Sequence, residues 1–171
     1  MIPDIFYLLL GIIFVYYIIQ LMRDEAIFIP LPKNTIRKML KLAKVKKNDV
    51  LYDLGSGDGR VLILATKEFG CKAIGIEKNF LLYLISKIRI KRENLTNKIK
   101  VVHGDFFKER LSQADVIFMY LSKKIANKLK LKFRKELKRG ARIVTADHKI
   151  EGWQEIKKIK TGHFYSYLYK V

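Results

Sequence analysis

The stretch from residue 50 to residue 60, Val-Leu-Tyr-Asp-Leu-Gly-Ser-Gly-Asp-Gly-Arg, places three alternate glycines directly after an apolar run. The run predicts a buried strand, and the apolar residues 62–65 predict a helix after the glycines. Glycine has no Cβ, so this turn can be sharp and can let a ligand lie against its amides. A strand, a glycine turn and a helix N-terminus together indicate a nucleotide-binding loop. The alternative is an ordinary tight turn without a ligand.

Two acids follow the glycine loop at the ends of the next predicted strands. Glu77 ends the strand 72–77, and Asp105 ends the strand 99–105. In a doubly wound sheet the carboxyl ends of parallel strands meet at one edge, so these acids and Asp53 should share a crevice. Two acids would repel a pyrophosphate, and the loop has the pattern G-x-G-x-G rather than G-x-G-x-x-G. A cationic sulfonium cofactor with an amino-acid tail therefore fits this crevice better than NAD does.

The glycine loop resembles the first motif of class I S-adenosylmethionine-dependent methyltransferases, and Glu77 and Asp105 match the acids of the next two motifs. More narrowly, the chain resembles the small protein-lysine methyltransferases that include ATP synthase c-subunit lysine N-methyltransferase and its archaeal relatives. The loop is specific for the superfamily, whereas the other matching pieces support the narrower family through their order. These pieces are Ile29-Pro-Leu-Pro32, Glu77-Lys-Asn79, Asp105-Phe-Phe-Lys108, Val116-Ile-Phe118, Arg142-Ile-Val144 and Gly152-Trp153.

The resemblance implies S-adenosyl-L-methionine as the cofactor and assigns a set of binding residues. Glu77 would hold the ribose, Asp105 the adenine amino group, and Phe106 would stack on the adenine ring. For Phe106 the alternative is packing in the core. The residues implied for the methionine end are Asp53, Gly55, Ser56, Gly57 and Gly59.

Strands and helices alternate along the chain, which predicts a doubly wound α/β fold. The predicted helices cover residues 60–68, 79–94 and 122–138, and the strands after the loop cover 72–77, 99–105, 114–120 and 141–147. The tail predicts a hairpin of strands 155–160 and 164–171, and with it the resemblance implies a Rossmann-like seven-strand methyltransferase sheet. We divide the chain into an anchor (residues 1–24), a linker with a cofactor-covering helix (25–48) and a methyltransferase domain (49–171). That helix is expected to begin at a cap formed by Asn34 or Thr35 and to end near Lys44; the alternative for this segment is a rigid spacer.

Residues 5–21 carry no charge and a single amide, which is near the minimum length for a transmembrane helix. The segment lacks the flanking features of a cleaved signal peptide. We therefore predict a single-pass anchor through residues 5–22, with a buried helix or a re-entrant hairpin as alternatives. The Lys and Arg excess downstream predicts a cell-membrane protein whose catalytic domain is cytoplasmic. The anchor is expected to contribute no residue to the crevice.

The predicted fourth strand ends with Phe118-Met-Tyr-Leu-Ser122, where methyltransferases contact their acceptor. Enzymes of the superfamily that act on planar nitrogens typically carry Asp or Asn, two prolines and an aromatic residue here, and this chain keeps only the aromatic Tyr120. We therefore predict a flexible lysine amine as the acceptor, in a slot dry enough to lower the lysine pKa. Tyr120 is the candidate catalytic residue of that slot; the alternative for it is plain packing.

The chain has a net charge of +19, although its first 32 residues hold one basic and three acidic residues. Many cations fall in the run 123–139, which predicts an amphipathic helix with a cationic outer face. This face is either simply solvated, or contacts anionic lipid, or binds nucleic acid. Cys71 is the only cysteine and the three histidines are dispersed, so no metal site is predicted.

We predict a membrane-associated protein as the substrate. A nucleic-acid methyltransferase and a non-catalytic cofactor-binding scaffold are the alternatives.

Overall fold

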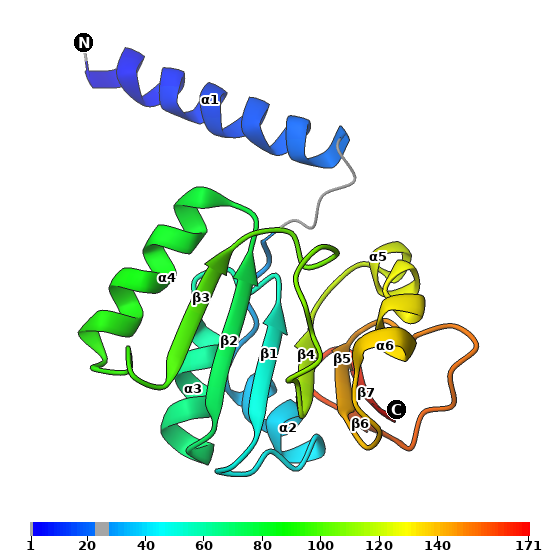
Figure 1. Cartoon of the computed structure of the whole chain (residues 1–171). Helices are drawn as coiled ribbons and strands as arrows, with labels where there is room; N and C mark the ends of the chain where they lie inside the picture. The colour runs from blue at the N-terminus through cyan, green and yellow to red at the C-terminus, as the bar shows by residue number, and fades with distance from the viewer. Residues whose placement is uncertain (1, 23–27) are drawn as a thin grey trace.

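The computed structural model describes residues 2–22 and 28–171, and within the first helix it describes the side chains of residues 5–16. Helices and strands alternate through most of the chain, as the hydrophobic pattern predicts (Figure 1). The elements are α1 Ile2–Met22, α2 Lys33–Leu42, β1 Val50–Leu54, α3 Arg60–Phe69, β2 Lys72–Glu77, α4 Phe80–Arg92, β3 Ile99–His103, β4 Val116–Met119, α5 Lys123–Lys128, α6 Lys130–Glu136, β5 Arg142–Ala146, β6 Lys157–Lys160 and β7 Tyr165–Lys170.

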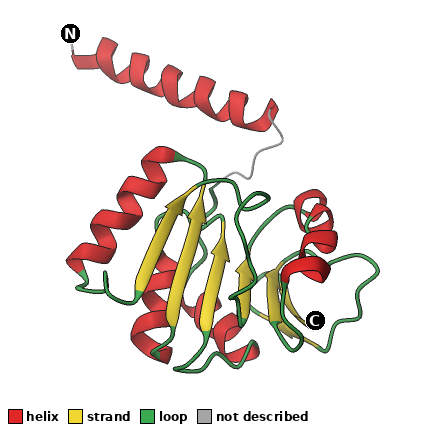
Figure 2. Ribbon diagram, viewed as in Figure 1, coloured by secondary structure: helices red, strands yellow, loops and turns green. Residues whose placement is uncertain are grey.

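The described strands form one seven-stranded sheet with the order β3-β2-β1-β4-β5-β7-β6 (Figure 2). The first five strands of this order run parallel, and β7 pairs antiparallel with both β5 and β6. β1 lies between β2 and β4, so the glycine loop that follows β1 emerges at the point where the strand order reverses. This is the predicted α/β fold with its seven-strand sheet, and it places the carboxyl ends of β1, β2 and β4 side by side.

Helices cover both faces of the sheet, and each face has its own hydrophobic core. On one face, α2, α3 and Ile90 of α4 pack against alternate residues of the strands, among them Leu51, Val116 and Val144. On the other face, α5 and α6 pack against Tyr52, Ile117 and the opposite side of the remaining strands. Parallel strands that are buried on both faces are apolar throughout, and the completely buried run of β4 follows this rule.

Two helices differ from the sequence prediction. α2 begins at Lys33 with Pro32 as its N-cap, so neither Asn34 nor Thr35 caps it. Proline is tolerated at the start of a helix because it lacks the N–H group, and the N–H groups there have no intrahelical acceptor. The predicted helix 122–138 is two helices that meet at Leu129. The Leu129 amide is shared between the carbonyls of Ile125 and Asn127, which tightens the turn and interrupts the α-helical ladder.

The run predicted as an anchor lies within α1, which crosses above the carboxyl ends of the strands in Figure 1. Among residues 2–22 and 28–171, no helix combines the length and the apolar content that crossing a bilayer requires, so the predicted membrane-spanning helix is not found there. Residues 23–27, which span the end of the predicted anchor and the start of the predicted linker, lie outside the described residues.

Candidate active site

A cleft of about 950 Å³ opens at the carboxyl ends of β1, β2 and β4. The segment 28–31 and residues of α1, α4 and α5 complete its walls. The three acids predicted to meet here do so, because the parallel register of the strands brings their ends to one edge. The predicted site residues that line the cleft are Asp53, Gly55, Ser56, Glu77, Asp105, Phe106 and Tyr120.

Gly57 and Gly59 are not on the cleft wall, and the structure gives each of them another role. Gly57 has φ +54, and a Cβ there would come within 2.6 Å of Phe28 Cδ2. Gly59 has φ +77, and a Cβ there would lie 3.0 Å from the Cβ of Ser86 in α4. At both positions glycine therefore permits a left-handed backbone conformation and lets a neighbouring side chain, Phe28 or Ser86, pack directly against the backbone.

The amides of the glycine loop bind the protein itself. Gly55 and Ser56 donate to the carbonyl of Ile76 (2.9 and 3.2 Å), and Gly57 donates to Glu77 Oε2 (2.7 Å). These bonds fix the loop to the end of β2. The amides of Gly55, Ser56 and Gly57 are therefore already used within the protein, and what the loop offers a ligand is close approach.

Glu77 connects the glycine loop to the start of α4. One oxygen of its buried carboxylate accepts from Gly57, and the other accepts from the amide of Asn79 (2.8 Å). A carboxylate has about four acceptor positions, so Glu77 retains capacity for the hydroxyls of a ribose. Asn79 in turn caps α4 by accepting from the amide of Leu82 (3.1 Å).

Asp53 is a buried acid that lacks a full set of partners. Its side chain lines the cleft, and its Oδ2 is buried without a hydrogen-bond partner among the described residues. Burial raises the pKa of Asp53 well above its usual value, and the charges of Glu77 and Asp58 raise it further. A cationic ligand group in the cleft would reverse this effect by stabilising the carboxylate.

Replacing Asp53 with asparagine should therefore change how stability depends on pH. An acid whose pKa is raised by folding stabilises the fold below its unfolded pKa, and this stabilisation is lost as the pH rises through the folded pKa. Between the unfolded and the folded pKa of Asp53, the free energy of unfolding of the wild type should fall by up to about 1.4 kcal/mol for each pH unit relative to that of Asp53→Asn. Urea denaturation of both proteins between about pH 5 and pH 8 measures this difference.

Asp115→Asn is a matched control for that titration. Burial alone would raise the pKa of Asp115, but hydrogen bonds from the Lys138 side chain and the Val50 amide lower it. The stabilisation that Asp115 provides is lost only in more acidic solution. The difference in free energy of unfolding between Asp115→Asn and the wild type should therefore stay constant between about pH 5 and pH 8. A flat difference for Asp53→Asn as well would contradict the assignment of a raised pKa to Asp53.

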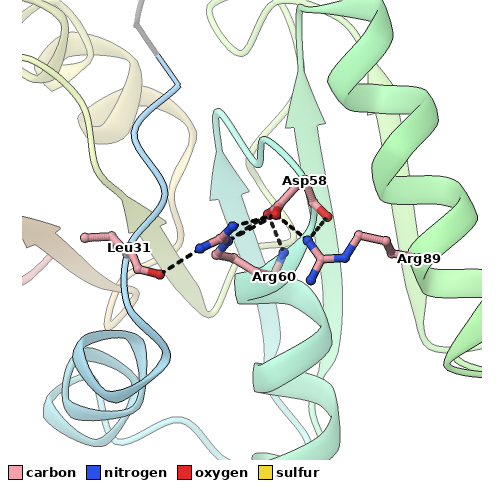
Figure 3. A network of polar contacts seen from close by, with 4 residues as sticks. All are labelled: Leu31, Asp58, Arg60 and Arg89. Carbon is pink, nitrogen blue, oxygen red and sulfur yellow. Dashed lines mark hydrogen bonds and ion pairs between the residues drawn. The ribbon is translucent and has the colours of Figure 1, made fainter.

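Asp58 and two arginines form a network that the sequence analysis missed (Figure 3). Arg60 binds both oxygens of Asp58, and Arg89 of α4 pairs with the same carboxylate. Burial would raise the pKa of Asp58, but the hydrogen bonds from Arg60 and the charges of both arginines bring it below its usual value. Arg60 also donates to the carbonyl of Leu31 (3.2 Å). The network thereby ties the segment 28–31 to the glycine loop and holds it over the cleft.

The adenine and acceptor candidates lie on the cleft wall, and each also packs against the protein. Phe106 contacts Phe107 with a ring separation of 4.9 Å and packs against the core, so both of its predicted roles are compatible with its position. Asp105 Oδ1 accepts from the amide of Phe107 (2.9 Å). Tyr120 stacks on Phe164 at 5.7 Å, and burial, followed by the charge of Asp147, raises its pKa.

α1 contributes to the cleft, contrary to the expectation from the sequence. Ile12, Ile13 and Tyr16 line the cleft, and the hydroxyl of Tyr16 accepts from the side-chain amide of Asn79. The period of an apolar helix does not reveal which of its residues face a domain. The sequence analysis therefore had no signal for this contact.

Comparison with known proteins shows the family to which this chain belongs. Residues 53–157 match the ANTKMT methyltransferase domain. This chain belongs to the ANTKMT methyltransferase family. A protein-lysine N-methyltransferase of Saccharolobus islandicus (strain REY15A) is 38% identical over 139 residues, which cover 80% of this chain and 86% of that protein. The enzyme is therefore an S-adenosylmethionine-dependent methyltransferase, which excludes the scaffold alternative.

Two other relatives extend the comparison. The human ATP synthase c-subunit lysine N-methyltransferase is 29% identical over 126 residues, and these cover 74% of this methyltransferase but only 53% of the human protein. The crystal structure of an RNA methyltransferase from Salinibacter ruber in complex with S-adenosyl-L-homocysteine superimposes with a TM-score of 0.82 at 31% identity. That match covers 84% of this chain and 94% of the other.

The residues of the cleft fit S-adenosylmethionine. Asp53 and Ser56 line the cleft, and their buried Oδ2 and Oγ lack partners within the described part of the chain, which suits a ligand with a cationic amino-acid end. Glu77 and Phe106, the residues predicted for the ribose and for the base, both line the cleft. The assignment of single residues to parts of the cofactor remains a prediction.

Proposed function

We propose that this methyltransferase transfers the methyl group of S-adenosylmethionine to a lysine side chain of a membrane-associated protein. The observation that carries the proposal is the apolar acceptor end of the cleft, where the side chains after β4 include Tyr120 and Leu121, with Ile125 beside them. The residues directly after β4, 120–126, include no carboxylate or amide side chain that could hold a planar nitrogen. The relatives named as lysine N-methyltransferases support the same acceptor.

The chain's own residues have to position two reactants and exclude water. S-adenosylmethionine supplies a methyl group on a sulfonium whose leaving group needs no protonation. Asp53 and Glu77 fix the donor side, while the segment 28–31 and α1 shield the cleft from solvent. Positioning of this kind can lower a barrier by about 7–11 kcal/mol, so the reaction needs no acid–base triad.

The acceptor lysine must be neutral to attack, and the cleft favours its neutral form. An exposed lysine has a pKa of about 10.4. Burial against Tyr120 and Leu121 and the positive charge of Lys128 on the same wall lower this value, whereas the negative charge of Asp147, which raises the pKa of Tyr120, acts in the opposite direction.

Methyl transfer to lysine should therefore become faster as the pH rises from about 7 to about 9, approaching tenfold per unit while the substrate amine is mostly protonated. Single-turnover rates with labelled donor measure this, and calorimetry over the same range should show nearly constant cofactor affinity. The raised pKa of Tyr120 keeps its own titration above this window. A rate that is flat or falls with pH would contradict a neutral amine as the nucleophile.

We also propose that α1 attaches the enzyme to the cell membrane, with the catalytic domain on the cytoplasmic side. Every described side chain of α1, from Ile5 to Tyr16, is exposed, and the exposed large residues are apolar or aromatic. Burying such a surface in a bilayer is favourable, whereas leaving it in water is costly. Recovery of the full chain in the soluble fraction without detergent would contradict this attachment.

An RNA acceptor is the second candidate. It is favoured by the +19 charge and by the name of the Salinibacter ruber enzyme. Several cations of the run 123–139 are nevertheless used within the fold: Lys123 pairs with Glu151, Lys132 with Glu136 and Lys138 with Asp115. These pairs reduce the charge that the run can offer to phosphates.

A further inference from the structure

α4 is apolar on both of its faces, although only one face packs against the domain. Ser86 and Ile90 are buried on the inner face, and Gly59 lies against Ser86. A helix with a single buried face normally carries polar residues on the other, and an apolar outer face indicates that something covers it. The exposed apolar residues of α4, here called the outer stripe, are Phe80, Leu81, Leu84, Ile85 and Ile88.

The outer stripe is continuous. Phe80, Leu84 and Ile88 follow one another at four-residue steps, and Leu81 and Ile85 fill the adjacent row. Phe80 is 59% exposed, Leu81 65% and Ile88 52%. This arc lies opposite Ser86 and Ile90 on the helix, so most of the stripe faces away from the sheet, while Phe80 at its start also contacts His103 of β3, with 5.4 Å between the ring centroids.

The stripe begins at the mouth of the active-site cleft and next to α1. Leu81 lines the cleft, and Asn79, the N-cap of α4, hydrogen-bonds Tyr16 of α1. α4 then runs down the flank of the domain beside β3 (Figure 1). Two exposed apolar elements therefore meet beside the active-site cleft.

The charges around the stripe indicate what covers it. α4 contains four basic residues and no acidic one, and Lys87, Lys91 and Arg92 are exposed. A second copy of the chain would bring the same cations against each other, because a twofold contact joins identical patches. An anionic lipid surface complements both the apolar stripe and the cations beside it.

We propose that α4 lies in the interface of an anionic membrane, with its outer stripe among the lipid chains and its cations at the headgroups. This inference rests on the proposed membrane attachment and adds a second contact that α1 alone does not provide. Contact through both α1 and α4 fixes the orientation of the domain. The mouth of the cleft then faces the bilayer surface, where it admits a lysine that lies close to the headgroups.

A fluorophore whose emission reports its environment can test this in the full chain. Cys71 is buried and burial raises its pKa to about 11, so an introduced cysteine can be labelled selectively. The label is attached in turn to Ile88→Cys in the stripe, to Leu9→Cys in α1 and to Leu131→Cys. Leu131 is the matched control, because it is an apolar residue of α6 that is 77% exposed. Retained cofactor binding and an unchanged melting temperature show that each labelled protein is folded.

With vesicles of phosphatidylglycerol and phosphatidylcholine, the label at residue 88 should shift to the blue and become protected from aqueous iodide. The label at residue 131 should remain in water. Leu84→Glu with Ile88→Glu should weaken vesicle binding about tenfold or more, while Leu131→Glu should leave it unchanged. Vesicles of phosphatidylcholine alone should bind less.

Each other outcome overturns the proposal. A shift at residue 9 without a shift at residue 88 would keep the attachment through α1 and reject the role of α4. A shift at residue 88 that appears without lipid and grows with protein concentration would identify a second copy as the partner. Absence of vesicle binding would reject both membrane contacts, whereas methyl transfer to a soluble lysine peptide would still support the proposed acceptor.

Discussion

Gly57→Val is expected to reduce binding of S-adenosylmethionine below detection in a titration calorimeter. The residue has φ +54, a conformation that costs an L-residue about 1–2 kcal/mol and a β-branched one more. Its new side chain would also collide with the ring of Phe28, a residue of the cleft wall. The loop or the ring has to move. A movement of the loop disturbs the hydrogen bond between Gly57 and Glu77, and a movement of the ring changes the cleft wall.

Gly152→Val is a control that introduces the backbone strain without the collision. Gly152 has φ +71, but a Cβ there would meet nothing within 4 Å. This variant should lose stability and keep its cofactor affinity. Adding Phe28→Ala to Gly57→Ala should recover part of the binding that Gly57→Ala loses. Normal cofactor affinity in a folded Gly57→Val protein would contradict the role assigned to the loop.

Glu77→Ala should destabilise the enzyme and weaken cofactor binding together. Its carboxylate is the acceptor for the amides of Gly57 and Asn79, and each such bond to a charged group contributes about 1.5–3 kcal/mol. Loss of the carboxylate also removes the acceptor predicted for the ribose hydroxyls. Urea denaturation measures the first effect, and calorimetry with S-adenosylmethionine measures the second.

Glu93→Ala is the control for a general effect of removing a negative charge. Glu93 lies at the end of α4 and pairs with Lys67 on the surface, so its loss should change both measurements little. Glu77→Gln keeps one acceptor oxygen and should fall between the alanine variant and the wild type. A Glu77→Ala protein with unchanged cofactor affinity would show that this carboxylate does not contact the cofactor.

The fold and the acidic cluster could be predicted because they depend on local patterns. Apolar runs of strand length alternate with helical periods, and this alternation leads to a parallel sheet. The acids Asp53, Glu77 and Asp105 come together because each stands at or just beyond the end of a strand, and parallel strands end at the same edge. Their convergence therefore required no knowledge of side-chain contacts.

Features that depend on contacts distant in sequence could not be predicted. Arg60 reaches the carbonyl of Leu31, and Arg89 reaches Asp58, across 29 and 31 residues. The ring of Phe28 occupies the space beside Gly57, so the absence of a Cβ there serves packing that no local pattern reveals. The outer stripe of α4 was hidden for a similar reason, because an apolar helix does not indicate which side the domain leaves exposed.

The acceptor can be identified most directly by incubating the purified full-length enzyme with methyl-labelled S-adenosylmethionine in the presence of both membrane proteins and RNA. Peptide and nucleoside mass spectrometry then locate the label. We predict methylated lysine in membrane-associated protein, no label in nucleosides, and loss of the signal in the Gly57→Val variant. Label in RNA nucleosides with none on protein lysine would contradict this prediction.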